Sequence, residues 1–246
     1  MSSDFYRSIA DYYDYIFPAN EKQVAFITEQ MQGDCTSKAL LEVGCGTGNL
    51  CNQLTQHFEH VSAIDINPLM IEKAEAKAFD SGRSIDLSCL DMLQIKSAFR
   101  PQHLDAIVCF GNTLAHLDSL LEISNFLQQA HFLLKPGGQI FLQIVNFDRI
   151  LQDNIRSLPV IDNKHIRFER FYSYDATSHK ITFRTILTEN VNKTAIENTT
   201  SLFPLQKNQL KDILHDCGFP HIQFFGTFTK EAWHESSMAT IVAASC

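Results

Sequence analysis

The sequence predicts an α/β fold built on a mainly parallel sheet, and three observations support this prediction. Residues 39–43 and 106–110 are largely apolar runs, typical of strands buried on both faces of a parallel sheet. Residues 120–134 repeat apolar side chains at helical spacing, and a Pro-Gly-Gly sequence follows that is expected to end the helix. Between the first strand and the next helix the chain passes through three glycines at alternate positions. Strands that alternate with amphipathic helices predict βαβ units.

Composition and charge limit the classes of partner. The chain has 246 residues, 45% hydrophobic and 20% charged, which suits one α/β domain over residues 1–246. No apolar run reaches the roughly 18 residues that a membrane helix needs, and residues 1–10 lack the apolar centre of a secretion signal. A formal net charge of −8 without a basic run disfavours nucleic acid, which is bound through Lys and Arg. We expect a small-molecule partner and no membrane, and a homodimer stays open.

The cysteines and histidines predict neither a disulfide framework nor a metal site. The seven cysteines are odd in number and include no Cys-x-x-Cys pair. The ten histidines are scattered, without a His-Glu-x-x-His motif. We therefore expect free cysteines, no bound metal and a reducing, cytoplasmic location.

The glycine turn at residues 44–48 predicts a nucleotide-type site. A strand that turns through glycines into a helix brings backbone N–H groups and a positive helix end close to a ligand. The spacing differs from the G-x-G-x-x-G of dinucleotide enzymes, because Gly48 comes one residue early and Asn49 takes the sixth position. No Lys follows, so a P-loop is also disfavoured. A glycine turn without a ligand is the alternative.

Asp65 argues for a ligand. It follows the first glycine by about 20 residues and ends a second predicted strand, 61–64, where a carboxylate can accept hydrogen bonds from ribose hydroxyls. Its alternative role is to cap the helix predicted for residues 68–78. Asn67, directly before Pro68, fits that cap better. The sequence therefore assigns Asp65 to a ribose.

Residues 42–49, with the sequence EVGCGTGN, resemble the first motif of class I S-adenosylmethionine-dependent methyltransferases. The resemblance implies a three-layer α/β/α sandwich with a seven-stranded, mostly parallel sheet, the Rossmann-like methyltransferase fold. It also implies S-adenosyl-L-methionine as cofactor. The cofactor-binding residues carried over are Tyr6, Tyr13, Glu42, Gly44, Cys45, Gly46, Asn49, Asp65, Ile66, Met70, Asp91, Met92, Phe110 and Gly111.

Two other segments contribute to this set. Residues 4–17 are rich in aromatics at helical spacing, and many small-molecule methyltransferases have a similar segment that closes over the cofactor. That likeness implies Tyr6 and Tyr13 near the methionine end, although docking of a helix also explains the spacing. An acidic residue after the third strand, followed by an apolar one, receives the adenine amino group in this family. Asp91 and Met92 match, and a solvated loop Asp is the alternative.

The substrate site is expected beyond the fourth strand. Ligands of open α/β sheets lie outside the carboxyl ends of the strands, so Phe110, Gly111, Asn112 and His116 should form its wall. Residues 111–117 and 145–151 resemble segments of glycine and sarcosine N-methyltransferases.

One position departs from those glycine enzymes. They carry an arginine for the substrate carboxylate directly before the Asn that corresponds to Asn146, and this chain has Val145 there. Because Val cannot pair with a carboxylate, glycine is disfavoured as the substrate. Arg170 or Arg184 would replace that arginine only if its side chain pointed inward.

After residue 145 the pattern changes. Residues 166–174 and 181–188 alternate in polarity, and residues 197–205 form a third pass. This pattern predicts an antiparallel β meander, or lid, inserted at about residues 155–205. The lid would cover the cleft or contact another subunit. A helix at residues 206–216 and strands at 221–228 and 239–244 complete the fold.

The predicted function is transfer of a methyl group from S-adenosylmethionine to N or O of a small molecule by in-line displacement. Because the sulfonium activates the methyl, proximity and exclusion of water should supply most of the catalysis, about 7–11 kcal/mol. No catalytic residue is assigned. His116 is the candidate for a base, and a wall residue without proton transfer is the alternative. A non-catalytic cofactor-binding or interaction protein and a nicotinamide oxidoreductase are the alternative functions. The predicted substrate contacts are Asn112, His116, Asn146 and Arg170.

Overall fold

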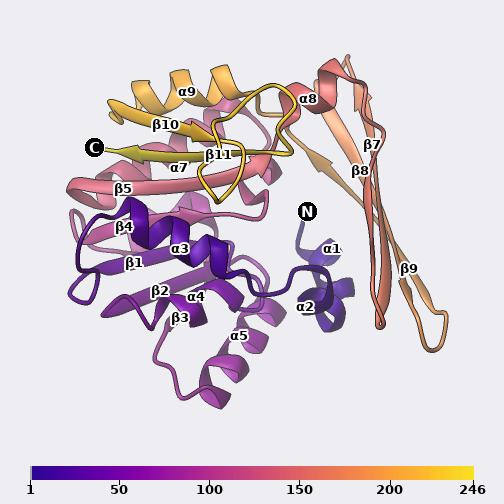
Figure 1. Cartoon of the computed structure of the whole chain (residues 1–246), viewed down its shortest axis with the longest axis horizontal. Coiled ribbons are helices and arrows are strands. Elements are labelled where there is room, and N and C mark those ends of the chain that lie inside the picture. Colours follow the sequence, from indigo (N-terminus) through magenta and orange to yellow (C-terminus); the bar gives the residue numbers. More distant parts are fainter. Residues whose placement is uncertain (1) are drawn as a thin grey trace.

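The computed structural model describes residues 2–246 and contains two β-sheets (Figure 1). The larger sheet has seven strands in the order β10-β11-β5-β4-β1-β2-β3, and the smaller has the order β6-β7-β8-β9. Strands β1 to β5 run parallel, whereas β11 is antiparallel to both β5 and β10. This confirms the predicted fold class. The larger sheet comprises β1 (Ala39–Val43), β2 (His60–Asp65), β3 (Asp86–Cys89), β4 (Leu104–Cys109), β5 (Leu134–Val145), β10 (His221–Phe225) and β11 (Ala239–Ser245).

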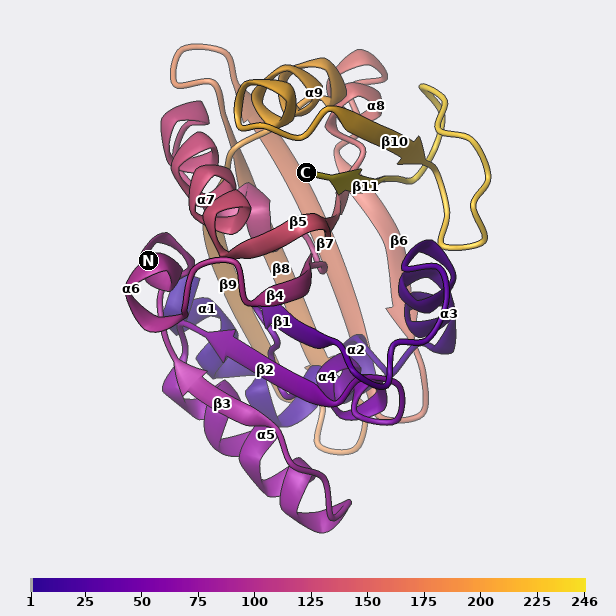
Figure 2. The same ribbon diagram turned by 90° about the vertical axis from the view of Figure 1, so that its left-hand side faces the viewer.

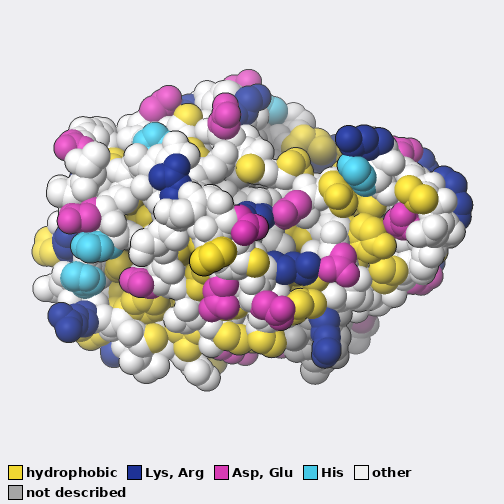
Figure 3. Space-filling model, turned by 90° about the horizontal axis from the view of Figure 1, so that it is seen from below, with side chains coloured by type: hydrophobic (Ala, Val, Ile, Leu, Met, Phe, Trp, Pro, Cys, Tyr) yellow, Lys and Arg dark blue, Asp and Glu magenta, His cyan; other side chains and the backbone are white. Residues whose placement is uncertain are grey.

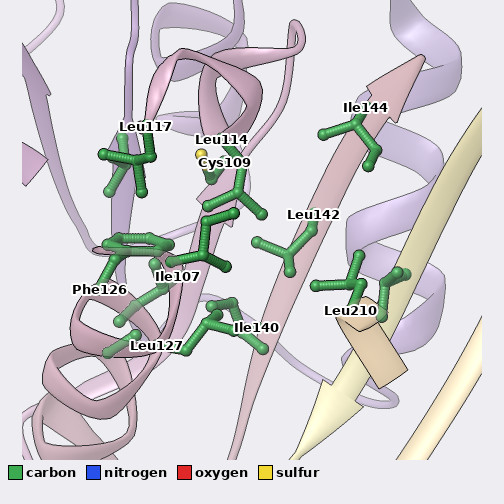
Figure 4. Packing of buried hydrophobic residues seen from close by; sticks show 14 of the residues in the cluster. Ile107, Cys109, Leu114, Leu117, Phe126, Leu127, Ile140, Leu142, Ile144 and Leu210 are labelled. Carbon is green, nitrogen blue, oxygen red and sulfur yellow. The ribbon is translucent and has the colours of Figure 1, made fainter. Parts of the chain in front are cut away.

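Helices cover both faces of the larger sheet because alternate strand residues point to opposite sides (Figure 2). Leu40 packs in a cluster with side chains of α3, α4 and α5, whereas its neighbour Leu41 packs with those of α6, α7 and α9. Figure 4 shows part of this second cluster, in which Ile107 and Ile140 of the sheet lie near Phe126 of α7. The helices are α3 (Glu21–Gln30), α4 (Asn49–Leu54), α5 (Pro68–Asp80), α6 (Ile95–Ala98), α7 (Leu120–Leu133) and α9 (Lys207–Asp216).

The start of β5 differs from the sequence prediction. The Pro-Gly-Gly segment lies within the strand instead of forming a separate turn. The pairing with β4 passes from Leu104↔Leu134 to Ala106↔Gln139, so the strand bulges there. Gly137 adopts φ +77°, which glycine tolerates, and its N–H donates to the carbonyl of Cys246. The helix still ends before the proline, as predicted.

The inserted segment forms the smaller sheet, with one strand more than the three passes predicted. It comprises β6 (Ser157–Asp162), β7 (Ile166–Asp175), β8 (Lys180–Glu189) and β9 (Ala195–Leu202), and it follows α8 (Phe147–Gln152). Strand β6 escaped prediction because it is short, mostly exposed and contains Pro159, a residue confined to sheet edges. Its pairing with β7 is also interrupted, between Leu158 and Ile161.

The N-terminal segment lies between the two sheets (Figure 1). Instead of one helix it forms α1 (Ser2–Ile9), the 3-10 turn η1 (Ala10–Tyr12) and α2 (Tyr13–Ile16). Phe5, Ile9 and Ile16 pack in one cluster with buried residues of β7 and β8. Within residues 2–246, no helix combines the length and apolarity needed to cross a bilayer.

Candidate functional site

The turn after β1 requires its glycines. Gly44, Gly46 and Gly48 have φ of +74°, +55° and +80°, a region that side chains disfavour. A Cβ on Gly44 would lie 2.5 Å from the side chain of Thr113, and one on Gly46 would lie 2.8 Å from the ring of Tyr13. The turn is therefore shaped by close approach of two other segments. Neither contact is visible in the local sequence.

Asp65 ends β2 beside this turn. Its carboxylate accepts a hydrogen bond from the N–H of Gly46 at 2.9 Å and one from the N–H of Asn67 at 2.9 Å. Burial raises the pKa of Asp65, although both hydrogen bonds act to lower it. Asn67 caps α5 by accepting from the N–H of Leu69, as the sequence indicated. Each carboxylate oxygen of Asp65 keeps a lone pair for a ligand hydroxyl.

Asp91 lies at the end of the neighbouring strand β3. Its carboxylate accepts from the N–H of Leu93 at 2.8 Å and so caps the turn η2 (Met92–Gln94). The N–H of Leu90 donates to the carbonyl of Asp65 at 3.0 Å. These bonds join the carboxyl ends of β2 and β3. Met92 is half-buried, Met70 is fully buried in α5, and Ile66 is 49% exposed.

Glu42 lies beneath the glycine turn and is 5% exposed. Burial raises its pKa to about 8, and the negative charge of Asp65 adds to this rise. Its Oε2 has no hydrogen-bond partner in residues 2–246. The group is therefore a neutral carboxyl at neutral pH, available to a buried donor. Cys45, in the turn, is buried as well, and burial raises its pKa.

Asp14 fastens the N-terminal segment to the turn. Its carboxylate accepts from the hydroxyl of Thr47 at 2.5 Å, from the amide of Asn49 at 3.0 Å and from Lys77 at 2.8 Å. Lys77 also bonds the side-chain oxygen of Asn49. This arrangement holds α2 over Gly46. Sequence analysis missed it because partners more than 30 residues apart leave no local pattern.

Tyr6 and His116 form a pair across the cleft. The hydroxyl of Tyr6 lies 2.9 Å from Nε2 of His116, which ends the turn η3 (Thr113–His116). Burial lowers the pKa of His116 to about 4, so its ring is neutral at neutral pH. Burial raises the pKa of Tyr6, and the charge of Asp65 adds to this effect. The Nδ1 of His116 has no partner in the part of the chain that the structure describes.

The residues after β4 divide into cleft and framework. Phe110 is buried against Phe228, with ring centroids 5.0 Å apart, and the N–H of Gly111 donates to Oε1 of Gln143 at 2.8 Å. Asn112 adopts φ +68°, and its side-chain oxygen accepts from the N–H of Val145 at 3.0 Å. Asn112 thus ties η3 to β5. A substrate role for it stays a prediction.

Asn146 is 1% exposed, and its amide is engaged within the protein. The NH₂ donates to the carbonyls of Glu235 and Ser237 at 2.9 and 3.0 Å, and the oxygen caps α8 by accepting from the N–H of Arg149. This bonding explains the residue as a joint between α8 and the loop before β11. A substrate role for Asn146 stays a prediction.

The two lid arginines differ in direction. Arg170 lies midway between the buried residues Phe168 and Tyr172 of β7. Alternate residues of a strand lie on the same face, so Arg170 lies on the inner face with them. Arg184 pairs instead with Glu197 at 2.5 Å, and both side chains are about half exposed. Only Arg170 lies on the inner face, and one of its terminal nitrogens donates to the carbonyl of Pro159 on the edge strand β6.

Comparisons with known proteins show similarity to methyltransferases. Residues 40–138 match the family described as "Methyltransferase domain". The chain is 26% identical over 213 residues to a glycine/sarcosine N-methyltransferase of Aphanothece halophytica, which covers 81% of this chain and 72% of that protein. It is 32% identical over 107 residues to a ubiquinone biosynthesis O-methyltransferase of Xylella fastidiosa, covering 44% of this chain and 42% of that protein. A solved S-adenosylmethionine-dependent methyltransferase from Clostridium acetobutylicum superposes with a TM-score of 0.81 at 16% identity, over 98% of both chains.

Proposed function

We propose that this chain, which is a class I S-adenosylmethionine-dependent methyltransferase, methylates a nitrogen or oxygen atom of a small molecule. One observation carries the proposal. The glycine turn, the Asp65 carboxylate and the Tyr6–His116 pair come together beyond the carboxyl ends of β1, β2 and β4. Ligands of open α/β sheets bind at this edge.

The residues present fit the cofactor. The three glycines bring backbone without side chains to this edge, with their N–H groups bonded to Ile64, Asp65 and Cys45 within the turn. Asp65 presents carboxylate lone pairs at the end of β2. Asp91 and Met92 lie at the end of β3, where they would hold the adenine. The unpartnered carboxyl oxygen of Glu42 and the ring of Tyr13 flank the turn, on the side assigned to the methionine end. When bound, the cofactor supplies a methyl group attached to positively charged sulfur.

The protein's own contribution is to exclude water and orient the acceptor. Tyr13 covers Gly46, and Asp14 fastens α2 over the turn, so the cleft is closed from the N-terminal side. His116 is neutral, but a pKa of about 4 makes it a weak proton acceptor. We therefore assign His116 to accept a hydrogen bond from the acceptor, with Tyr6 fixing its ring. An ammonium acceptor would release its proton to bulk water before it enters the site, which leaves the nitrogen lone pair free to form the bond to the methyl carbon.

Charge supports a small acceptor. On the face shown in Figure 3, Lys and Arg side chains are interspersed with Asp and Glu and form no basic patch. The formal net charge is −8, which disfavours binding to phosphate backbones. The proposal includes a reducing, cytoplasmic setting, because the seven cysteines are free. A homodimer stays a prediction that light scattering tests.

Calorimetry and turnover test the proposal. S-Adenosylmethionine and S-adenosylhomocysteine should bind with micromolar affinity and NAD should not bind. Mass spectrometry should then find a methylated product in a panel of amines, phenols and acids. With that acceptor, His116→Ala should lower kcat about 10–100-fold through misplacement, while cofactor affinity stays the same. His131→Ala, in α7 away from the cleft, is the matched control. Cofactor binding without turnover over the whole panel would favour a non-catalytic role.

A further inference from the structure

We propose that Arg170 and Thr185, on the inner face of the smaller sheet, bind an oxyanion of the methyl acceptor, a carboxylate or a phosphate. The inference rests on the proposed function and extends it, because it names the end of the acceptor that is not methylated. Neither side chain belongs to the cofactor site.

The strand register places the two residues together. Arg170 of β7 lies directly opposite Thr185 of β8, and the neighbouring pairs are Phe168↔Leu187 and Tyr172↔Phe183. All of these side chains share one face because the residues of a strand alternate between its two sides. Arg170 and Thr185 are thus a polar pair within an otherwise apolar stripe.

This stripe meets two different hydrophobic clusters. Phe168 and Leu187 pack with the N-terminal helices, whereas Tyr172 and Ile181 pack with the core of the larger sheet. Arg170 and Thr185 stand between these two groups. Asn198 of β9 pairs with Thr185 and shares this face, but its amide donates to the hydroxyl of Ser8 at 2.7 Å.

Both side chains have unused hydrogen-bonding capacity. Thr185 is 0% exposed, and its Oγ1 has no partner within residues 2–246. The Nε of Arg170 is buried and also lacks a partner there, while one terminal nitrogen donates to the carbonyl of Pro159 at 2.7 Å. Among the described residues, no carboxylate forms an ion pair with Arg170. Burial lowers its pKa, and the guanidinium lies over the ring of Phe168, 5.9 Å from the centroid.

An oxyanion satisfies all of these groups at once. A guanidinium presents its N–H donors in a fixed fork that matches the oxygens of a carboxylate or phosphate, and a threonine hydroxyl donates a further bond.

The pair is also within reach of the methylation site. Tyr172, two residues after Arg170, contacts Phe183 with ring centroids 5.3 Å apart. Phe5 contacts Tyr6, whose hydroxyl bonds His116, with ring centroids 5.0 Å apart. Phe183, opposite Tyr172, contacts the ring of Phe5 in α1 with a centroid distance of 5.8 Å. The acceptor is therefore a short molecule with an amine or hydroxyl at one end and an oxyanion at the other.

Ligand-observed NMR on the protein saturated with S-adenosylhomocysteine tests the proposal without turnover. The probes are glycine, 4-hydroxybenzoate and phosphoethanolamine, each beside its neutral counterpart: glycinamide, 4-hydroxybenzamide and ethanolamine. At least one oxyanion should bind about 10-fold or more tightly than its counterpart, as expected for a charge-assisted pair. The carboxylate and phosphate arms show which oxyanion is preferred.

Variants locate the effect. Arg170→Gln should abolish the preference and Thr185→Val should weaken it about threefold, while Arg184→Gln, on the outer face, should leave it unchanged. Arg170→Lys keeps the positive charge but loses the paired N–H donors of the guanidinium, so it should retain part of the preference for the oxyanion. If Arg170→Gln does not fold, the preference measured for Arg170→Lys tests the proposal in its place. A wild-type protein without any oxyanion preference, or a preference that survives both Arg170 variants, would overturn the proposal. Failure of wild type to bind S-adenosylhomocysteine would instead overturn the proposed function.

Discussion

The two sheets treat their polar groups in opposite ways. At the carboxyl edge of the larger sheet, Asp65, Asp91 and Asn112 each accept hydrogen bonds from backbone N–H groups. On the inner face of the smaller sheet, Arg170 and Thr185 keep buried polar atoms without partners in the described chain. The polar groups of the first surface are hydrogen-bonded within the protein without a ligand. Those of the second surface retain hydrogen-bonding capacity that a ligand would satisfy. The first arrangement suits binding of the cofactor, and the second suits binding of a particular acceptor.

The N-terminal segment joins these two surfaces. Its polar contacts, through Asp14, go to the glycine turn and α5, whereas its apolar contacts, through Phe5 and Ile9, go to the smaller sheet. The first set depends on charge and the second on burial. Three predictions test whether the two regions are separable in this way.

The largest effect is expected in the lid. Phe168 is 1% exposed and packs against the N-terminal segment, so Phe168→Ala should lower the local free energy of opening by about 3–5 kcal/mol. Hydrogen exchange of residues 5–17 and of β7 should accelerate, while β1 stays protected. Phe171→Ala, at the outward parity, is the control. Equal acceleration in β1 would show that the two regions open as one unit.

A smaller effect is expected at the cofactor edge. Asp65→Ala should cost about 1–3 kcal/mol of S-adenosylhomocysteine affinity, or roughly 5- to 160-fold, because a charged acceptor is lost. Calorimetry measures the change, and Asp86→Ala, exposed on the edge strand β3, is the matched variant. An affinity equal to that of wild type would remove Asp65 from the ribose site.

The third prediction concerns the pH dependence that the buried carboxyl of Glu42 gives to stability. Its pKa is about 8 in the folded chain against 4.5 ordinarily, so between these values the folded state holds a proton that the unfolded state releases. Stability therefore falls as pH rises through this interval, by up to about 1.4 kcal/mol per pH unit. Glu42→Gln should remove that part of the slope.

Urea unfolding of the cofactor-free protein at both ends of the interval measures this effect. The advantage of Glu42→Gln over wild type should be least near the acid end and greatest near the alkaline end. Glu75→Gln, exposed on α5, corrects for the loss of one charge. Parallel pH profiles for Glu42→Gln and wild type would contradict a buried, protonated Glu42.

Local pattern was sufficient for the framework of the larger sheet. The apolar runs gave β1 and β4, the glycines gave the turn, and the Asn67-Pro68 pair gave the start of α5, because each depends on residues next to one another. Strand β6 and the bulge at the start of β5 were missed, since pairing with distant strands defines them. The break of the N-terminal segment into α1, η1 and α2 was missed as well.

The sequence by itself determined the fold class, the cofactor edge and the position of Asp65 at the end of a strand, because short-range periodicity and glycine geometry encode them. Only the tertiary structure decided that Asp14 reaches Lys77, that Asn146 is held within the framework, and that Arg170 points inward beside Thr185. These outcomes depend on which segments, far apart in the chain, pack against one another. Alternation along a strand assigns neighbouring lid side chains to opposite faces of the sheet. Packing against segments that are distant in the chain determines which of the two faces is buried.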